Sequence, residues 1–108
     1  KPFTPEQVEQ LNEFGIELND FFNYAIHILK ENKIDSIDDL IEKRNILVER
    51  LKLIEKDQIK RIKANEVSTR NSVLFFNVIT ETKSMLLNLI NLVKAQRDFN
   101  SENKQLLN

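Results

Sequence analysis

The chain has 108 residues and a formal net charge of -1, with 41% hydrophobic and 31% charged residues. This is enough chain for one domain. The near-neutral charge argues against a strongly basic nucleic-acid binder and against electrostatic attachment to anionic lipid. With one Gly, two Pro and no Cys, the chain has too few turn residues for an all-β fold. It also has no disulfides, no thiolate metal ligands and no cysteine nucleophile.

The first predicted helix spans about residues 5–31. Thr4 can cap its start, Pro5 suits the first helical position, and Gln7 completes a capping box. Apolar residues then recur at the spacing of a helix packed on two neighbours. The predicted core face comprises Val8, Leu11, Phe14, Gly15, Leu18, Phe21, Phe22, Ala25, Ile28 and Leu29. On that face Gly15 is expected to allow close contact with a neighbouring helix or Phe, the alternative being a ligand against the backbone.

Two more helices follow at similar length. Ser36, with acids in the next turn, predicts the start of the second, and Asn65 predicts its left-handed stop, so it spans about 37–64. Ser68 or Thr69 caps the third, over about 69–99, and residues 100–108 are expected to form a frayed polar tail. The predicted cores are Ile37, Leu40, Ile41, Leu47, Val48, Leu51, Ile54 and Ile62, then Leu74, Phe75, Val78, Ile79, Met85, Leu86, Leu89, Ile90, Leu92 and Val93.

The predicted fold is all-α: an antiparallel, up-down-up three-helix bundle forming one domain over residues 1–99. Connections of about four residues force consecutive helices to run antiparallel. No apolar run is longer than that from Val73 to Phe76, so we expect no membrane span in this stretch, and no signal peptide is visible. Because the chain begins with Lys1 rather than Met, we expect it either to be part of a longer protein or to be processed.

Chemically active side chains do not converge on one predicted site. The one His, His27, falls on the outer face of its helix, so no His metal cluster and no His-paired nucleophile is expected. Three charged sets could bind ions but are better explained as solvated faces or helix-end stabilisation: Glu9, Glu13 and Glu17; Asp35, Asp38 and Asp39; and Lys52, Lys56, Lys60 and Lys63, whose alternative role is binding phosphate or anionic headgroups. We therefore expect no enzyme activity, no metal and no cofactor.

Apolar residues outside the predicted core are more informative. Ile46 and Leu53 point away from the core stripe of the second helix, and Phe76 and Leu87 share an outer face of the third, with Val73 next to it. Sets of exposed apolar residues on separate helices are typical of contact surfaces. We predict that at least one of these sets binds a partner protein or a second copy.

Four segments between Lys56 and Phe99 carry a family resemblance: Gln58-Ile59-Lys60-Arg61-Ile62, Ser68-Thr69-Arg70-Asn71-Ser72, Phe75-Phe76-Asn77-Val78-Ile79-Thr80-Glu81 and Asn88-Leu89-Ile90-Asn91-Leu92-Val93-Lys94-Ala95. This stretch, about 40% of the chain, resembles the PhoU-like helical domain at the C-terminal, cytoplasmic end of bacterial sodium/phosphate cotransporters.

The resemblance implies a non-catalytic regulatory or interaction domain of PhoU-like fold. Its implied location is the cytoplasmic side of the inner membrane, and its implied partner is the membrane transport domain of its own parent protein. The alternative is a free-standing helical adaptor or dimerisation module unrelated to transport.

PhoU-type proteins carry a pair of carboxylates on this third helix that binds a multinuclear metal site. The matching positions here are Lys83 and Leu87, a cation and an aliphatic side chain. Glu81 is close in sequence but about 200° around the helix from Lys83, and a multinuclear site needs several anionic oxygens. The metal site implied by the family is therefore not carried over to this sequence.

Overall fold

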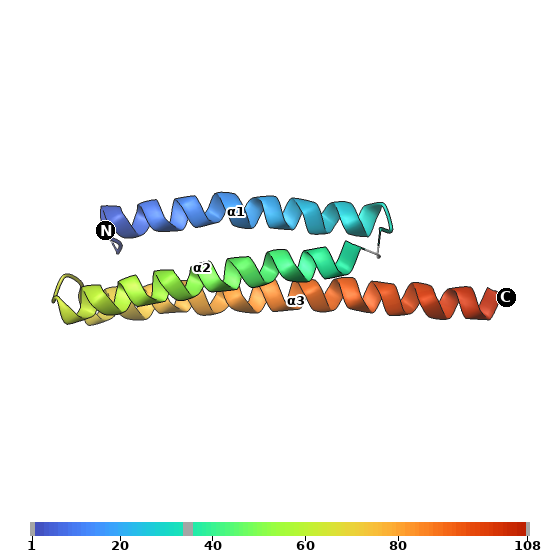
Figure 1. Ribbon diagram of the computed structural model, residues 1–108. Coiled ribbons are helices and arrows are strands. Elements are labelled where there is room, and N and C mark those ends of the chain that lie inside the picture. The colour runs from blue at the N-terminus through green and yellow to red at the C-terminus, as the bar shows by residue number, and fades with distance from the viewer. Residues whose placement is uncertain (1, 34–35, 108) are drawn as a thin grey trace.

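The computed structural model of the protein describes residues 2–33 and 36–107, and it contains three helices and no strand in that part of the chain. They are α1 (Pro5–Lys30), α2 (Ile37–Lys63) and α3 (Thr69–Leu107). Figure 1 shows the three helices lying side by side, with the chain direction of α2 opposite to that of α1 and α3. The molecule is long and narrow, 64 × 21 × 19 Å. The prediction of an all-α fold with three helices is confirmed.

The helix starts follow the predicted signals, with one difference in chemistry. Gln7 N donates to Thr4 Oγ1 at 3.2 Å and Thr4 N donates to Gln7 Oε1 at 2.9 Å, which completes the predicted capping box. For α3 the cap is Ser68, whose Oγ accepts from Asn71 N at 3.0 Å. Ser36 precedes α2 as predicted, but its side chain makes no capping hydrogen bond. Asp35, one of the predicted capping acids, lies outside the described residues.

Asparagine in the left-handed region follows each of the first two helices, with φ 53° at Asn32 and 59° at Asn65. After Asn65, Glu66 N donates to Arg61 O at 2.9 Å, and after Asn32, Lys33 N donates to Ile28 O at 3.0 Å. These bonds satisfy carbonyls that the ends of the helices leave free. The predicted stop at Asn65 is confirmed.

The predicted end of α3 near Phe99 is wrong, because the helix continues to Leu107. Residues 100–107 contain neither Gly nor Pro and include Glu, Lys, Gln and Leu, all good helix formers. The sequence of these residues therefore contains no signal that would end α3 at the point where α1 ends and α2 begins. Figure 1 shows the last turns of α3 extending beyond the end of α1 and the start of α2.

The core is narrower than the apolar pattern suggested. Most predicted core residues are buried or pack against the buried cluster. Six predicted core residues are instead exposed: Val8, Gly15, Ile62, Val78, Met85 and Leu92. A helix in a three-membered bundle contacts two neighbours over a limited arc, so residues at the margins of a wide apolar stripe stay in solvent. For Gly15, neither close helix contact nor space for a Phe is the explanation, since a Cβ added there meets nothing within 4 Å.

Candidate interaction surfaces

A buried polar cluster joins the three helices near the turn between α2 and α3. Gln7 of α1, Gln58 of α2 and Asn71 of α3 are each at most 8% exposed. Gln7 Nε2 donates to Gln58 Oε1 at 2.8 Å and to Asn71 Oδ1 at 2.7 Å. Asn71 Nδ2 donates to Gln7 Oε1 and to Pro2 O, both at 2.8 Å. Gln58 Nε2 reaches Ser72 Oγ at 3.2 Å.

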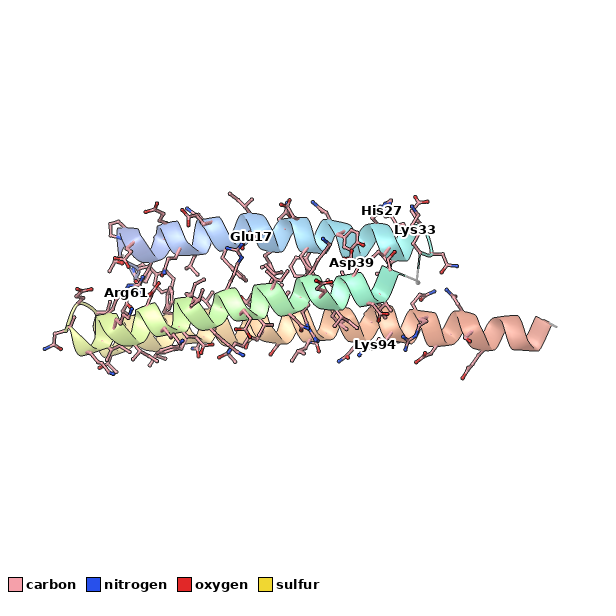
Figure 2. The ribbon with its side chains drawn as sticks, viewed as in Figure 1. Glu17, His27, Lys33, Asp39, Arg61 and Lys94 are labelled. Atoms are coloured by element: carbon pink, nitrogen blue, oxygen red, sulfur yellow. The ribbon has the colours of Figure 1, made fainter. Side chains whose placement is uncertain are left out.

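Arg61 closes this cluster toward solvent. Its side chain is 4% exposed and lies 5.7 Å from the ring centroid of Phe75. Nη1 donates to Gln58 Oε1 at 2.9 Å, and Nη2 donates to Glu6 Oε1 at 2.7 Å and Gln10 Oε1 at 2.5 Å. Figure 2 shows Arg61 between α1 and α2 at this end of the bundle. Among the buried side-chain polar atoms of the described residues, Arg61 Nε is the one without a partner, so the cluster is well suited to fixing the alignment of the helices.

The predicted surface on α2 lies beside a groove that α1 and α2 form. Ile46 and Leu53 are exposed, at 53% and 60%. Arg50 lies between them in the sequence, and its Nε is 3.0 Å from Oε2 of Glu17 on α1, the residue that Figure 2 shows reaching toward α2. Two adjoining hollows share Arg50 and Glu17, one of about 230 Å³ containing Leu53 and one of about 410 Å³ containing Ile46. The ion pair between Arg50 and Glu17 therefore lies between Ile46 and Leu53, the two apolar residues of this surface.

The larger hollow ends on a polar arrangement around the chain's one tyrosine. Tyr24 Oη donates to Asp39 Oδ2 at 2.5 Å, and Lys43 Nζ lies 5.2 Å from the Tyr24 ring centroid. The hydrogen bond to Asp39 raises the pKa of Tyr24 above its usual value, and burial and the Asp39 charge act in the same direction. This arrangement ties the second half of α1 to the first turn of α2.

The predicted surface on α3 is confirmed only in part as exposed surface. Val73 and Leu87 are 54% and 51% exposed, whereas Phe76 is half-buried against the core. The sequence prediction also missed a second exposed row on the same helix, because three of its members were assigned to the core and the fourth was expected at the end of the helix. This row consists of Val78, Met85, Leu92 and Phe99.

The charged sets lie as predicted for solvated faces and helix ends, within the part of the chain that is described. Glu9, Glu13, Asp38 and His27 are exposed, as are Lys52, Lys56, Lys60 and Lys63. Two other members, Glu17 and Asp39, are used in the contacts with Arg50 and Tyr24. Among residues 2–33 and 36–107, no group of three or more His, Asp or Glu side chains is placed to hold a metal ion.

Lys83 and Leu87, the two positions that the resemblance aligns with the carboxylate pair of PhoU-type proteins, do not suit a metal. Lys83 is ion-paired with Glu55 of α2, and Leu87 is an exposed aliphatic side chain. A protonated lysine donates hydrogen bonds and cannot coordinate a cation. The residues on this face of α3 therefore do not fit a multinuclear metal centre.

One helix, over Thr69–Glu102, is long and apolar enough by length and composition to cross a membrane, with a mean hydropathy of 1.3 over its most apolar window. Only 22% of that window is buried. The count of consecutive apolar residues did not reveal this, because Asn, Ser and Thr interrupt the apolar runs of α3 without adding charge. The core helix of a bundle can have the same composition, so the finding is weak evidence for a span.

In comparisons with protein-family models, curated proteins and solved structures, nothing matches this chain.

Proposed function

We propose that this chain is a non-catalytic regulatory or interaction domain of PhoU-like, up-down-up topology. In this proposal it forms the cytoplasmic tail of a sodium-dependent phosphate transporter in the inner membrane. Two of the segments that carry the family resemblance, 58–62 and 68–72, flank the turn between α2 and α3. The observation that carries the proposal is that these segments make a joint structural contact.

That contact is the buried polar cluster. Gln58 and Arg61 come from the first segment, and Ser68, Asn71 and Ser72 come from the second. Gln58 donates to Ser72 and Asn71, while Ser68 caps the helix that presents Asn71. The resemblance therefore rests on side chains that hold the bundle together, which is a physical reason for a family of bundles to share them.

Such a domain acts through contact rather than chemistry. The exposed apolar residues Ile46, Leu53, Val73 and Leu87, with half-buried Phe76 at their edge, are the proposed surface for the parent's membrane portion or another protein. Exposed apolar groups set among polar ones are typical of protein contact sites. In this proposal neither sodium nor phosphate binds to these helices, and no metal centre is required for their action.

The first experiment is to read the whole open reading frame that encodes this chain. We expect several hydrophobic membrane helices before Lys1. In cells that express the whole protein, deleting the bundle should then alter sodium-dependent uptake of radiolabelled phosphate without abolishing membrane insertion. A reading frame without membrane helices would favour the free-standing adaptor or dimerisation module, which the exposed row Val78, Met85, Leu92 and Phe99 of α3 also supports.

A further inference from the structure

One flank of α3 carries a regular row of exposed apolar side chains. Val78, Met85, Leu92 and Phe99 are 38%, 47%, 55% and 57% exposed. Seven residues fall about 20° short of two helical turns, so these side chains form a single, slowly drifting row. The sequence places Leu106 at the next position of the same spacing.

The contacts of α3 identify this flank as the one beside α1. Asn71, seven residues before Val78, exchanges two hydrogen bonds with Gln7 of α1, at 2.7 and 2.8 Å, and accepts one longer bond, at 3.3 Å, from Gln58 of α2. Lys83, on the opposite flank of α3, is paired with Glu55 of α2. The row therefore borders the side where α1 and α3 meet, which is the least extensive of the three helix contacts. Val8 and Ile26 of α1, at 43% and 45% exposed, add further apolar surface to α1.

Charge is scarce along this part of α3. Between Asn71 and Val93, the stretch with the first three members of the row, the charged residues are Glu81 and Lys83, and Lys83 is already paired with Glu55. Between Leu92 and Phe99 the charged residues are Lys94, Arg97 and Asp98, of which Arg97 and Asp98 pair with each other. By contrast, about half of the residues of α2 are charged. Depletion of charge around exposed apolar residues is characteristic of the core of a protein interface, and homodimer interfaces are the more apolar class.

A lipid surface is a poor match for the same row. Helices that lie on membranes flank their apolar face with Lys and Arg, whereas the row from Val78 to Phe99 has three basic residues in its stretch of α3: Lys83, Lys94 and Arg97. Two of them are already paired, Lys83 with Glu55 and Arg97 with Asp98. A membrane-spanning α3 is a poor match too, because its opposite face holds Phe75, Ile79 and Leu86 in the core at no more than 2% exposure. A protein surface with little charge is the better occupant.

We propose that the row Val78, Met85, Leu92 and Phe99 is the contact surface of a homodimer, in which α3 packs antiparallel on α3 of a second copy. The inference rests on the proposed function as an interaction domain and names one of its partners. A symmetric dimer places the same patch of both copies face to face. A nearly uncharged patch suits this arrangement, since like charges would otherwise meet across the interface.

Side-chain size and charge favour the antiparallel pairing. With the two-fold axis between Asn88 and Leu89, Met85 faces Leu92 of the second copy, and the small Val78 faces the large Phe99. Pairing of large with small residues fills the space between two helices evenly. Glu81 then faces Gln96, an amide, whereas a parallel pairing would set Glu81 against its own copy.

The length of the row is adequate for a stable contact. From Val78 to Phe99 it extends about 32 Å at 1.5 Å per residue. A helix flank of that length offers on the order of several hundred Å² per copy, which is of the same order as the roughly 800 Å² per partner of a standard interface.

Sedimentation velocity of the 108-residue chain over a range of concentrations tests the proposal. We expect a species of twice the 12.7 kDa chain mass. Leu92→Glu and Met85→Glu should each raise the dimer dissociation constant about tenfold or more, because each buries a charge without a partner. Helix content by circular dichroism should stay unchanged, since both side chains are exposed in the single chain. Ile16→Glu on α1 and Ile59→Glu on α2, which change exposed apolar residues on other helices, are matched controls that should still dimerise.

Cysteine cross-linking tests the orientation, and the chain has no cysteine of its own to interfere. Under mild oxidation, a mixture of the Met85→Cys and Leu92→Cys variants should form a disulfide-linked dimer, whereas either variant alone should not. Cross-linking of Met85→Cys with itself would overturn the antiparallel arrangement.

Three further outcomes would overturn the dimer itself. They are a chain that stays monomeric at the highest soluble concentration, loss of the dimer in Leu87→Glu but not in Leu92→Glu, and binding to phosphatidylcholine/phosphatidylglycerol vesicles that depends on Leu92 while the chain remains monomeric. None of them bears on whether membrane helices precede Lys1, so the proposed transporter tail would be tested separately. A reading frame without such helices would in turn leave this dimer standing.

Discussion

Near the turn between α2 and α3, Gln7, Gln58 and Asn71 exchange hydrogen bonds in the interior, whereas toward the opposite end the core includes apolar residues such as Ile28 and Leu40. Burial of apolar surface is non-directional, so many small shifts of one helix along another would cost the apolar end little. Hydrogen bonds need set distances and angles. We infer that the apolar end supplies most of the stability and that the polar end fixes the alignment of the helices.

The largest expected effect tests the apolar part of the core. Leu86 is fully buried, and its neighbour Leu87 is 51% exposed. Leu86→Ala should lower the free energy of unfolding by about 2–5 kcal/mol, the range for large-to-small changes in a core. Leu87→Ala should change it by about 0.5 kcal/mol or less. Urea denaturation followed by circular dichroism measures both, and similar losses in the two variants would show that the side of α3 that faces the core is misassigned.

The next effect tests the polar end. Asn71→Ala removes a partner from Gln7 and Gln58, and it leaves Pro2 O without its donor. A buried polar group that loses its partner costs about 1–3 kcal/mol, so we expect a loss in that range, measured by the same denaturation. The control is Asn77→Ala on the exposed side of α3, expected within about 0.5 kcal/mol of the wild type. Equal stabilities of the two variants would mean that the polar cluster does not bind the helices together.

The contrast between the apolar and polar ends of the core also explains which features could be predicted from the sequence. Capping residues and apolar spacing predicted the three helices and their first two ends, because both signals are local. The polar cluster was missed although a signal for it exists, since it continues the seven-residue spacing of the core. The series are Gln7, Phe14, Phe21 and Ile28; Leu40, Leu47, Ile54 and Arg61; and Ser72, Ile79, Leu86 and Val93. A search for apolar residues alone stops one position short in each helix.

The exposed apolar sites were only partly predictable, for a different reason. Ile46 and Leu53 point roughly opposite the core stripe of α2, so spacing alone places them outside the core. Met85 and Leu92 lie at the margin of the stripe of α3, where burial depends on how closely α1 approaches. That distance is a property of the packed bundle and has no local signal in the sequence.

A smaller effect, an increase rather than a decrease in stability, is expected between the two ends of the bundle, at Gly15. Gly15 is in the middle of α1, exposed, with no atom within 4 Å of the position of an added Cβ. Gly15→Ala should therefore raise the free energy of unfolding by about 0.5–1 kcal/mol, because Ala loses less conformational entropy in a helix. Thermal and urea denaturation should agree on the sign. Destabilisation of the monomer would contradict the exposed position of Gly15.

The smallest effect concerns the apolar end, where Tyr24 is hydrogen-bonded to Asp39. The pKa of Tyr24 is raised by this bond first, then by burial and the Asp39 charge, because ionisation would place a phenolate beside a carboxylate. The folded state therefore favours the protonated phenol. Its contribution to stability is complete below the unfolded pKa of about 10 and is lost as the pH rises through the higher folded value.

An ultraviolet titration can measure this shift directly, since the chain has one Tyr and no Trp. We expect the phenolate to form with a midpoint above 10 in the folded wild type. Asp39→Asn should lower that midpoint, because it removes the negative charge while keeping an acceptor oxygen. Asp38→Asn, an exposed neighbour on the same turn of α2, should leave it in place. If both variants titrate like the wild type, Tyr24 is not bonded to Asp39 in solution, and the connection between α1 and α2 at this end depends on apolar contacts alone.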